Sequence, residues 1–334
     1  MIRIRKLKLA RVVAMLPLIV ILAASASTHA AGYPDKPVRI VITTTAGGQA
    51  DVVARTLAAK LSEKLGAQFV VDAKPGANGI IATEHVAKAT SDGYTLLMAT
   101  GSHAINPAVY SRLPFDAKRD FAPIALVVPP GPLVLLAHPS VAANSVGELL
   151  ALAKGRSNAF SYGSAGVGNT SHLGGEMLQQ LTGIKFTHAP YKGMSQAVND
   201  LVAGHIQLMF NPWPVVEGFV KEGKLKVLAQ SGASRAPSLP NIPTLAEAGV
   251  KDFDLTGWYV LLAPAGTPTD IVSALNKAVI DAMTHADTQA KLASLGSGPP
   301  LPLKPAEVAA FVVTETSRME RVAKAASISL ETPR

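Results

Sequence analysis

Apolar residues after position 32 occur in two alternating patterns. Residues 38–43 form a short β-branched run typical of a strand, and residues 51–65 carry apolar side chains at helical spacing. Gly47-Gly48 separates the two segments, and glycines of this kind permit tight turns. The pattern therefore predicts a strand, a glycine loop and an amphipathic helix, which is how an α/β unit begins.

The same alternation continues towards the C-terminus. We predict further strands over 68–72, 95–99, 160–163, 185–189, 206–210, 227–230 and 258–263. We predict further helices over 79–89, 146–152, 173–181, 194–203, 269–284, 286–295 and 305–325. Repeated alternation of strands and helices favours a mostly parallel sheet covered by helices.

Two proline-rich segments divide this series. Residues 129–132 separate the apolar runs 123–128 and 133–137, and residues 231–243 are rich in Ser, Pro and Asn. We therefore expect one lobe from residues 31–129 plus 232–334 and a second lobe from residues 130–231. Two α/β lobes suggest a ligand cleft between them.

The first 30 residues follow the plan of a secretory signal peptide. Five basic residues and no acidic ones precede an apolar run over 12–24, and small residues follow, with a candidate cleavage signal at Thr28-His29-Ala30. The apolar run is well short of the roughly 20 residues that span a bilayer. We expect cleavage near Ala30 and export of a soluble mature chain.

Charge and cysteine content then exclude several classes of function. The chain has 31 Lys and Arg against 23 Asp and Glu, a net charge of +8. Loss of the five basic residues of the signal peptide leaves +3, so charge does not favour nucleic-acid binding. The absence of cysteine excludes disulfides, Cys-ligated metal centres, a thiol nucleophile and a lipid-modified cysteine.

Two loops between a strand and a helix are candidates for ligand binding. The first holds Thr43, Thr44, Thr45, Ala46, Gly47 and Gly48, and Asp51 follows at the helix start. The second holds Ser164, Ala165, Gly166, Gly168, Asn169 and Thr170. Glycines allow close approach of a ligand, and the first N–H groups of a helix lack intrahelical partners, so either loop could hold an anion without Arg or Lys. An ordinary strand–helix connection is the alternative for the first loop.

Catalytic and cofactor motifs are missing. The second loop has Ser171 where a dinucleotide fingerprint needs glycine, it lacks the ending of a Walker loop, and Tyr162 stands where a Gly-x-Ser-x-Gly elbow needs glycine. No pair of histidines has the helical spacing of a metal site. His172 and His103 flank polar loops, and Ser164 or another serine with His172 would be the nucleophile and base of a secreted hydrolase. We expect no enzyme activity, no metal and no cofactor.

Motifs along the whole mature chain resemble the Bug family, the solute receptors of tripartite tricarboxylate transporters. They are Tyr33-Pro34-x-Lys36-Pro37-Val38-Arg39, Gly47-Gly48-x-x-Asp51, Pro75-Gly76-Ala77-x-Gly79, Asp92-Gly93-Tyr94, Ala104-Ile105-Asn106-Pro107, Gly163-Ser164-x-Gly166-x-Gly168, Pro190-Tyr191-Lys192-Gly193 and Ala263-Pro264-Ala265-Gly266-Thr267-Pro268.

The resemblance implies a monomeric periplasmic binding protein with a type II-like fold, whose two α/β lobes are joined by crossover connections and close on a small carboxylate. It implies delivery of that ligand to the membrane subunits of a tripartite tricarboxylate transporter. The two glycine loops would grip one carboxylate, with Ser102, His103 and Tyr191 in further cleft walls and Trp258 as a weaker candidate near the mouth. A periplasmic sensor that reports to a signalling partner is the alternative function.

Two positions depart from the family pattern. Thr44-Thr45-Ala46 stands where an aromatic residue and a proline are more usual before the glycines, so additional hydroxyl groups could face the ligand. Gln207 stands where an Asp is common. If that Asp normally orients a bridging water, Gln207 would change the water network and the choice of ligand.

Overall fold

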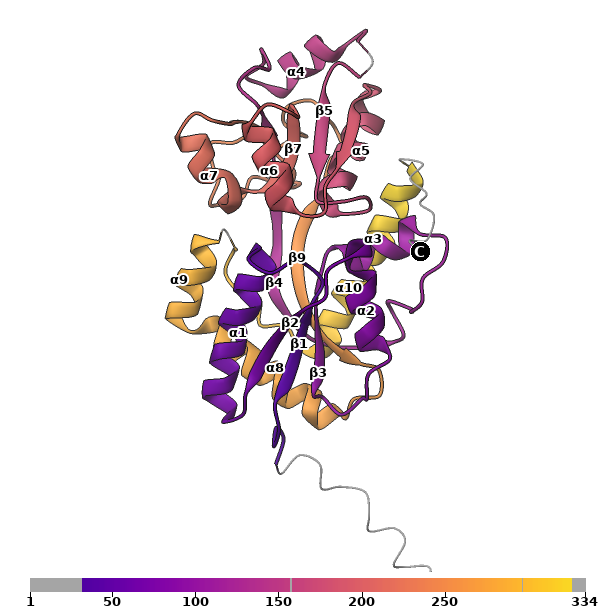
Figure 1. The fold of residues 1–334 in the computed structure, drawn as a ribbon, viewed down its shortest axis with the longest axis vertical. Helices are drawn as coiled ribbons and strands as arrows, with labels where there is room; N and C mark the ends of the chain where they lie inside the picture. Colours follow the sequence, from indigo (N-terminus) through magenta and orange to yellow (C-terminus); the bar gives the residue numbers. More distant parts are fainter. Residues whose placement is uncertain (1–31, 157, 296, 326–334) are drawn as a thin grey trace, which may run out of the picture.

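Two groups of secondary-structure elements lie at opposite ends of the molecule, and two long strands run between them (Figure 1). The computed structural model describes residues 32–156, 158–295 and 297–325. The predicted signal peptide lies outside the described residues. We call the group that contains the first strand lobe 1 and the other group lobe 2.

The elements of each lobe come from separate parts of the chain. Lobe 1 contains β1 (Val38–Ile42), α1 (Gln49–Leu65), β2 (Phe69–Ala73), the 3₁₀ turn η2 (Ala77–Gly79), α2 (Ile80–Ala87), β3 (Thr95–Thr100), α3 (Ser102–Val109), α8 (Thr269–Thr284), α9 (Ala286–Ser294) and α10 (Pro305–Ala325). Lobe 2 contains α4 (Val146–Ala153), β5 (Ser161–Ser164), α5 (Thr170–Thr182), β6 (Thr187–Pro190), α6 (Met194–Val202), β7 (Leu208–Pro212), α7 (Trp213–Lys221) and β8 (Lys226–Gln230). The crossing strands are β4 (Phe121–Ala137) and β9 (Thr256–Pro264).

The strands form one mixed sheet, in the order β2-β1-β3-β9-β4-β7-β5-β6 with β8 paired to β4. Pairing is parallel at both ends of the sheet, between β1 and its neighbours β2 and β3 and between β5 and its neighbours β6 and β7. It is antiparallel wherever β4 or β9 takes part. The expectation of a mostly parallel sheet is therefore wrong in the centre, because the chain leaves lobe 1 on β4 and returns in the opposite direction on β9.

Strand β4 is one continuous strand where the apolar runs predicted two. Pro129, Pro130 and Pro132 lie inside it, next to shifts in the register of β4 against β9. Proline cannot donate a ladder hydrogen bond, so it is tolerated in a strand mainly at edges and bulges. The proline block that we expected to separate two lobes is thus part of the connection that joins them.

The segment that follows β8 is hydrogen-bonded to the end of that strand. Gln230, at the end of β8, donates from Nε2 to the carbonyls of Leu239 at 3.0 Å and Ile242 at 2.6 Å. A bridge between Gln230 and Thr244 continues this contact. Because these bonds tie residues 236–244 to lobe 2, we propose that the second boundary lies in β9 and not at residue 232.

Helices α3 and α7 were not predicted. Each begins within two residues of the end of a strand, and each contains proline: Pro107 lies inside α3, and Pro214 lies in the first turn of α7. Proline is accepted in the first turn of a helix because the N–H group there has no intrahelical partner. Proline and short length together hid both helices from a prediction based on periodicity.

Helix α5 packs very closely on the sheet of lobe 2, and two adjacent glycines make this possible. A Cβ atom on Gly174 would lie 2.9 Å from the ring of Phe210, and one on Gly175 would lie 2.2 Å from the ring of Tyr162. The Tyr162 ring cannot move aside easily, because it is 2% exposed and its hydroxyl donates to Glu176 Oε1 at 2.6 Å.

We therefore expect Gly175→Ala to lower the free energy of unfolding by about 1–3 kcal/mol, because it overpacks this contact. Gly218→Ala is the matched control, since Gly218 lies in α7 and a Cβ atom there would have no neighbour within 4 Å. There the gain in helix propensity should stabilise the protein by up to about 1 kcal/mol. Urea denaturation measures both variants, and equal effects would contradict the packing argument.

Candidate functional site

The first glycine loop, residues 43–48, connects β1 to α1 and contains several polar groups without a hydrogen-bond partner. Among the described residues, the hydroxyl oxygens of Thr43 and Thr44 are buried without a hydrogen-bond partner. The N–H groups of Ala46, Gly48 and Gln49 also find no partner in this part of the chain. Buried hydroxyl groups normally find a partner, so the two threonine hydroxyls, together with the free N–H groups before and at the start of α1, are suited to an acceptor supplied from outside the chain.

Asp51 stabilises this loop from the first turn of α1. Its Oδ2 accepts hydrogen bonds from the Gly47 N–H at 2.9 Å and from Arg55 Nε at 3.0 Å. Burial raises the pKa of the Asp51 carboxyl, but the bonds from Arg55 and Gly47 outweigh burial and leave that pKa below its usual value. Asp51 therefore stays ionised and holds the loop in shape.

The second glycine loop, between β5 and α5, has largely satisfied its own donors. The Ala165 N–H donates to Ser171 Oγ at 3.1 Å, and the Gly168 N–H donates to His172 Nδ1 at 3.1 Å. Asn169 caps α5, because its Oδ1 accepts from the Ser171 N–H at 3.0 Å. The two loops thus differ: among the described residues, the second pairs most of its N–H groups within the chain, and the first leaves most of its N–H groups without a partner.

The fold places each glycine loop against the opposite lobe. A Cβ on Gly193 of lobe 2 would lie 3.6 Å from Thr45 Oγ1, and a Cβ on Gly101 of lobe 1 would lie 3.3 Å from Thr170 Oγ1. The Tyr110 hydroxyl donates to the Val167 carbonyl at 3.4 Å. These contacts between lobes show a closed arrangement.

Asn78 forms the strongest of these links, and the sequence analysis did not identify it. Its Nδ2 donates to the Gly168 carbonyl of lobe 2 at 2.7 Å and to Asn106 Oδ1 at 2.7 Å. Its Oδ1 accepts from Ser102 Oγ at 2.9 Å. Asn78 has a positive φ of 51°, a conformation that Asn tolerates better than most residues. It occupies the position left open in the motif Pro75-Gly76-Ala77-x-Gly79.

Other predicted site residues lie elsewhere. His103 points into the core of lobe 1, with its Nε2 3.0 Å from the Ala117 carbonyl and its ring against Phe115 and Phe121. Gln207 lies at the opposite end of β5 from Ser164, where its Oε1 accepts from the N–H and hydroxyl of Ser161. Strand β7 runs parallel to β5, so a residue that precedes β7 is placed away from the second loop. Neither His103 nor Gln207 faces the loops.

Tyr191 stays beside the second loop. A Cβ on Gly166 would lie 3.3 Å from the Tyr191 carbonyl, and the Tyr191 hydroxyl donates to Asp200 Oδ2 at 2.7 Å. Its side chain is therefore anchored to α6.

Trp258 is 2% exposed, and its Nε1 donates to Glu315 Oε2 at 3.1 Å.

A stacked cluster of Tyr162, His172 and His188 lies beneath the second loop. The rings of His172 and His188 have centroids 4.2 Å apart. Ser164 is fully buried, and its Oγ lies 2.7 Å from His188 Nε2. The hydrolase alternative required Ser164 to pair with His172, whereas the structure pairs Ser164 with His188. The Ser164 hydroxyl is also fully buried, so a substrate could not reach it.

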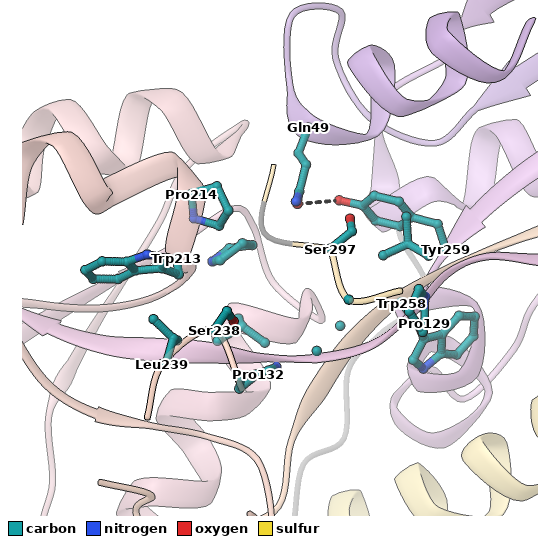
Figure 2. A pocket seen from close by; sticks show the side chains of 16 residues that line it. Gln49, Pro129, Pro132, Trp213, Pro214, Ser238, Leu239, Trp258, Tyr259 and Ser297 are labelled. Atoms are coloured by element: carbon teal, nitrogen blue, oxygen red, sulfur yellow. Dashed lines mark hydrogen bonds between the residues drawn. The ribbon is translucent and has the colours of Figure 1, made fainter. Parts of the chain in front are cut away.

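A pocket opens beside the first loop, between the crossing strands and the start of α7 (Figure 2). Gln49, the first residue of α1, lines it together with Tyr259 of β9, and the Tyr259 hydroxyl donates to Gln49 Oε1 at 2.9 Å. Trp213, Pro214 and Leu239 form the facing wall in Figure 2. The pocket therefore begins at the residue that follows the first loop.

Within the described parts of the chain, no three His, Asp or Glu side chains gather as a metal site would require. Within the same parts, no helix is long and apolar enough to cross a membrane.

We expect Asn78→Gly to weaken ligand binding by about tenfold, because it removes one hydrogen bond between the lobes in the closed form. Glycine adopts the positive φ at this position without strain. Calorimetric titration with an organic acid that the protein binds provides the measurement. Asn158→Gly is the matched control, since Asn158 also has a positive φ, of 59°. Equal losses in both variants would contradict the role of Asn78 in closure.

Stability should fall in acid because of the histidine cluster. Burial lowers the pKa of His172 to about 4, and burial together with the nearby His172 lowers the pKa of His188 to about 4, against the attraction of Glu176. Both are neutral in the folded protein, whereas in the unfolded chain they take up protons below about pH 6.5. The contribution of these two histidines to the free energy of unfolding should therefore be complete above pH 6.5 and be lost as the pH falls towards 4.

His172→Phe keeps a stacked ring and removes one titrating group, so it should make this decrease shallower by as much as about 1.4 kcal/mol per pH unit. His285→Gln, at an exposed site, serves as the control. Urea denaturation between pH 4 and pH 8 provides the measurement, and identical slopes for His172→Phe and the native protein would contradict the assignment.

Comparisons with known proteins agree with this architecture. Residues 53–328 match the family model described as tripartite tricarboxylate transporter family receptor. Protein BugT of Bordetella pertussis is 31% identical over 309 residues, which cover 92% of this chain and 94% of BugT. These matches extend over nearly all of the chain that the structure describes.

Three solved structures share the fold. Rpa4515 of R. palustris with adipate has a TM-score of 0.83 at 36% identity and covers 89% of this chain and 100% of its own. The periplasmic binding protein BugD has a TM-score of 0.82 at 32% identity, with coverage of 89% and 100%. MatC from Rhodopseudomonas palustris with bound malate has a TM-score of 0.81 at 31% identity, with coverage of 87% and 99%. The fold is the type II-like fold of periplasmic binding proteins, and the chain belongs to the tripartite tricarboxylate transporter receptors, the TctC or Bug family of solute-binding proteins.

Proposed function

We propose that the protein is a periplasmic receptor that binds a small organic acid by its carboxylate and delivers it to the membrane subunits of a tripartite tricarboxylate transporter. The observation that carries this proposal is the set of unpaired donors at the first loop, from the Thr43 hydroxyl to the N–H of Gln49. A carboxylate is the acceptor that such a set fits, because helix N-termini favour negative charge. The adipate and malate held by two similar proteins support this ligand class.

Closure of the lobes would strengthen the grip on the carboxylate. Most N–H groups of the second loop have partners within the chain, so it would contribute shape and exclude water when the lobes close. Exclusion of water strengthens the interaction between the N–H dipoles and the bound charge. The bond from Asn78 to the Gly168 carbonyl then favours the closed form. A ligand shifts the lobes towards closure only by as much as it binds the closed form more tightly.

The closed receptor is the form that we propose the membrane subunits recognise. Its periplasmic location rests on the family and on the signal peptide predicted in residues 1–30. Deletion of the gene should abolish uptake of the bound acid, whereas a protein that serves only as a sensor would leave uptake intact.

Gly48→Asp provides a direct test of the carboxylate site. Gly48 is the N-cap of α1, with an extended backbone at φ −80° and ψ 172°, and its Cβ would make only an ordinary contact with the Thr45 carbonyl at 3.6 Å. Aspartate is a favourable N-cap residue in this conformation. Its carboxylate should accept hydrogen bonds from the N–H groups that otherwise bind the ligand. Ligand binding should therefore fall by more than about 100-fold, with no loss of thermal stability.

Gly48→Ala is the matched control, because it adds the same Cβ without the carboxylate. It should retain binding within about tenfold of the native protein. A thermal-shift screen of organic acids on refolded, ligand-free protein identifies the ligand first, since saturation at 100 times the dissociation constant stabilises by about 2.7 kcal/mol. Undiminished binding by Gly48→Asp would refute the carboxylate site at this loop.

A further inference from the structure

We propose that the ligand is a short monocarboxylate, whose uncharged body lies in the pocket between Gln49, Trp213 and Tyr259. This inference rests on the proposed function, since it takes the first loop as the carboxylate site. It adds the chemical class of the ligand, which the family does not determine. Adipate and malate, the ligands of two similar structures, each carry two carboxylates, so the inference separates this chain from them.

The position of the pocket makes it the continuation of the carboxylate site. Gln49 follows Gly48 directly and is both the first residue of α1 and part of the pocket wall. Both polar atoms of its side-chain amide are hydrogen-bonded, since Nε2 donates to the Leu295 carbonyl at 2.6 Å and Oε1 accepts from the Tyr259 hydroxyl. A molecule whose carboxylate occupies the first loop would therefore extend past Gln49 into this space.

The pocket wall contains no charged side chain. The sixteen lining residues drawn in Figure 2 are apolar, glycine, or uncharged polar residues, and none of these described residues is Lys, Arg, His, Asp or Glu. A second carboxylate in this pocket would lose part of its hydration with no cation to pair with. Even partial burial of an unpaired charge is unfavourable. The wall therefore discriminates against dicarboxylates.

One polar group in the wall remains without a partner among the described residues. The Ser297 hydroxyl is buried and unpaired, whereas Gln49 and Tyr259 satisfy each other. Figure 2 shows Ser297 on the same side of the pocket as Gln49 and Tyr259, opposite Trp213 and Leu239. A hydroxyl group of the ligand could pair with Ser297, so a short hydroxylated monocarboxylate should bind more tightly than its unsubstituted parent.

The size of the pocket limits the length of the body. Its volume is about 70 Å³. It is about half of the roughly 150 Å³ cavity that accommodates benzene. A chain of a few carbon atoms fits the closed form, and an aromatic ring does not.

Calorimetric titration of the refolded, ligand-free protein with matched acids tests this inference. Butanoate and 4-hydroxybutanoate should bind at least tenfold more tightly than butanedioate, which has the same chain length and one more carboxylate. Butanoate should also bind more tightly than benzoate. Equal or tighter binding of butanedioate, or tighter binding of benzoate, would overturn the inference and leave the carboxylate receptor intact. Failure of every mono- and dicarboxylate to bind would instead overturn the proposed function.

A charge introduced into the pocket should reverse the selectivity. Ser238 lines the pocket and is exposed, so Ser238→Arg should fold and should give a second carboxylate a partner. We expect this variant to bind butanedioate at least tenfold more tightly than the native protein does. Ser238→Gln, which has a long side chain without charge, should show no such gain. Unchanged selectivity in a folded Ser238→Arg would show that the ligand body lies elsewhere.

Discussion

Every helix leaves its first N–H groups without an intrahelical partner, and the function of this protein depends on how two helices meet that constraint. Helix α5 meets it in part from within, because Asn169 Oδ1 accepts from the Ser171 N–H. Helix α1 does not, since its N-cap is Gly48 and has no side chain to offer. Each of the two loops lies against the opposite lobe, Thr45 beside Gly193 and Thr170 beside Gly101.

Local patterns predicted most elements because their physical causes are local. Helices α8 and α10 have the bounds expected from their spacing, 269–284 and 305–325. Pairing between strands depends on contacts far apart in the chain, and the periodicity of β4 and β9 carries no information about their direction. For the same reason the proline block in β4 was interpreted as a boundary, although register shifts accommodate it within one strand.

The candidate site was predictable in part. Glycine loops after β1 and β5 could be found because a strand, a glycine turn and a helix follow one another directly. The position of Gln207 could not, since the sequence does not reveal which end of a strand meets the cleft. His103 was misplaced because a histidine beside a polar loop can turn into the core, as this one does between Phe115 and Phe121. Asn78 carried no signal beyond its place in a turn.

Strands β4 and β9 run side by side over the whole connection, from the pair Phe121 and Pro264 to the pair Pro132 and Thr256. Two adjacent strands of this kind behave as a single ribbon, which bends far more easily about an axis across its width than it shears or stretches. Pro129, Pro130 and Pro132 remove ladder donors at the end of the ribbon next to lobe 2, so we expect it to bend most easily there. The stiffness of this ribbon can therefore change the energy of opening, and with it the affinity, through residues that never contact the ligand.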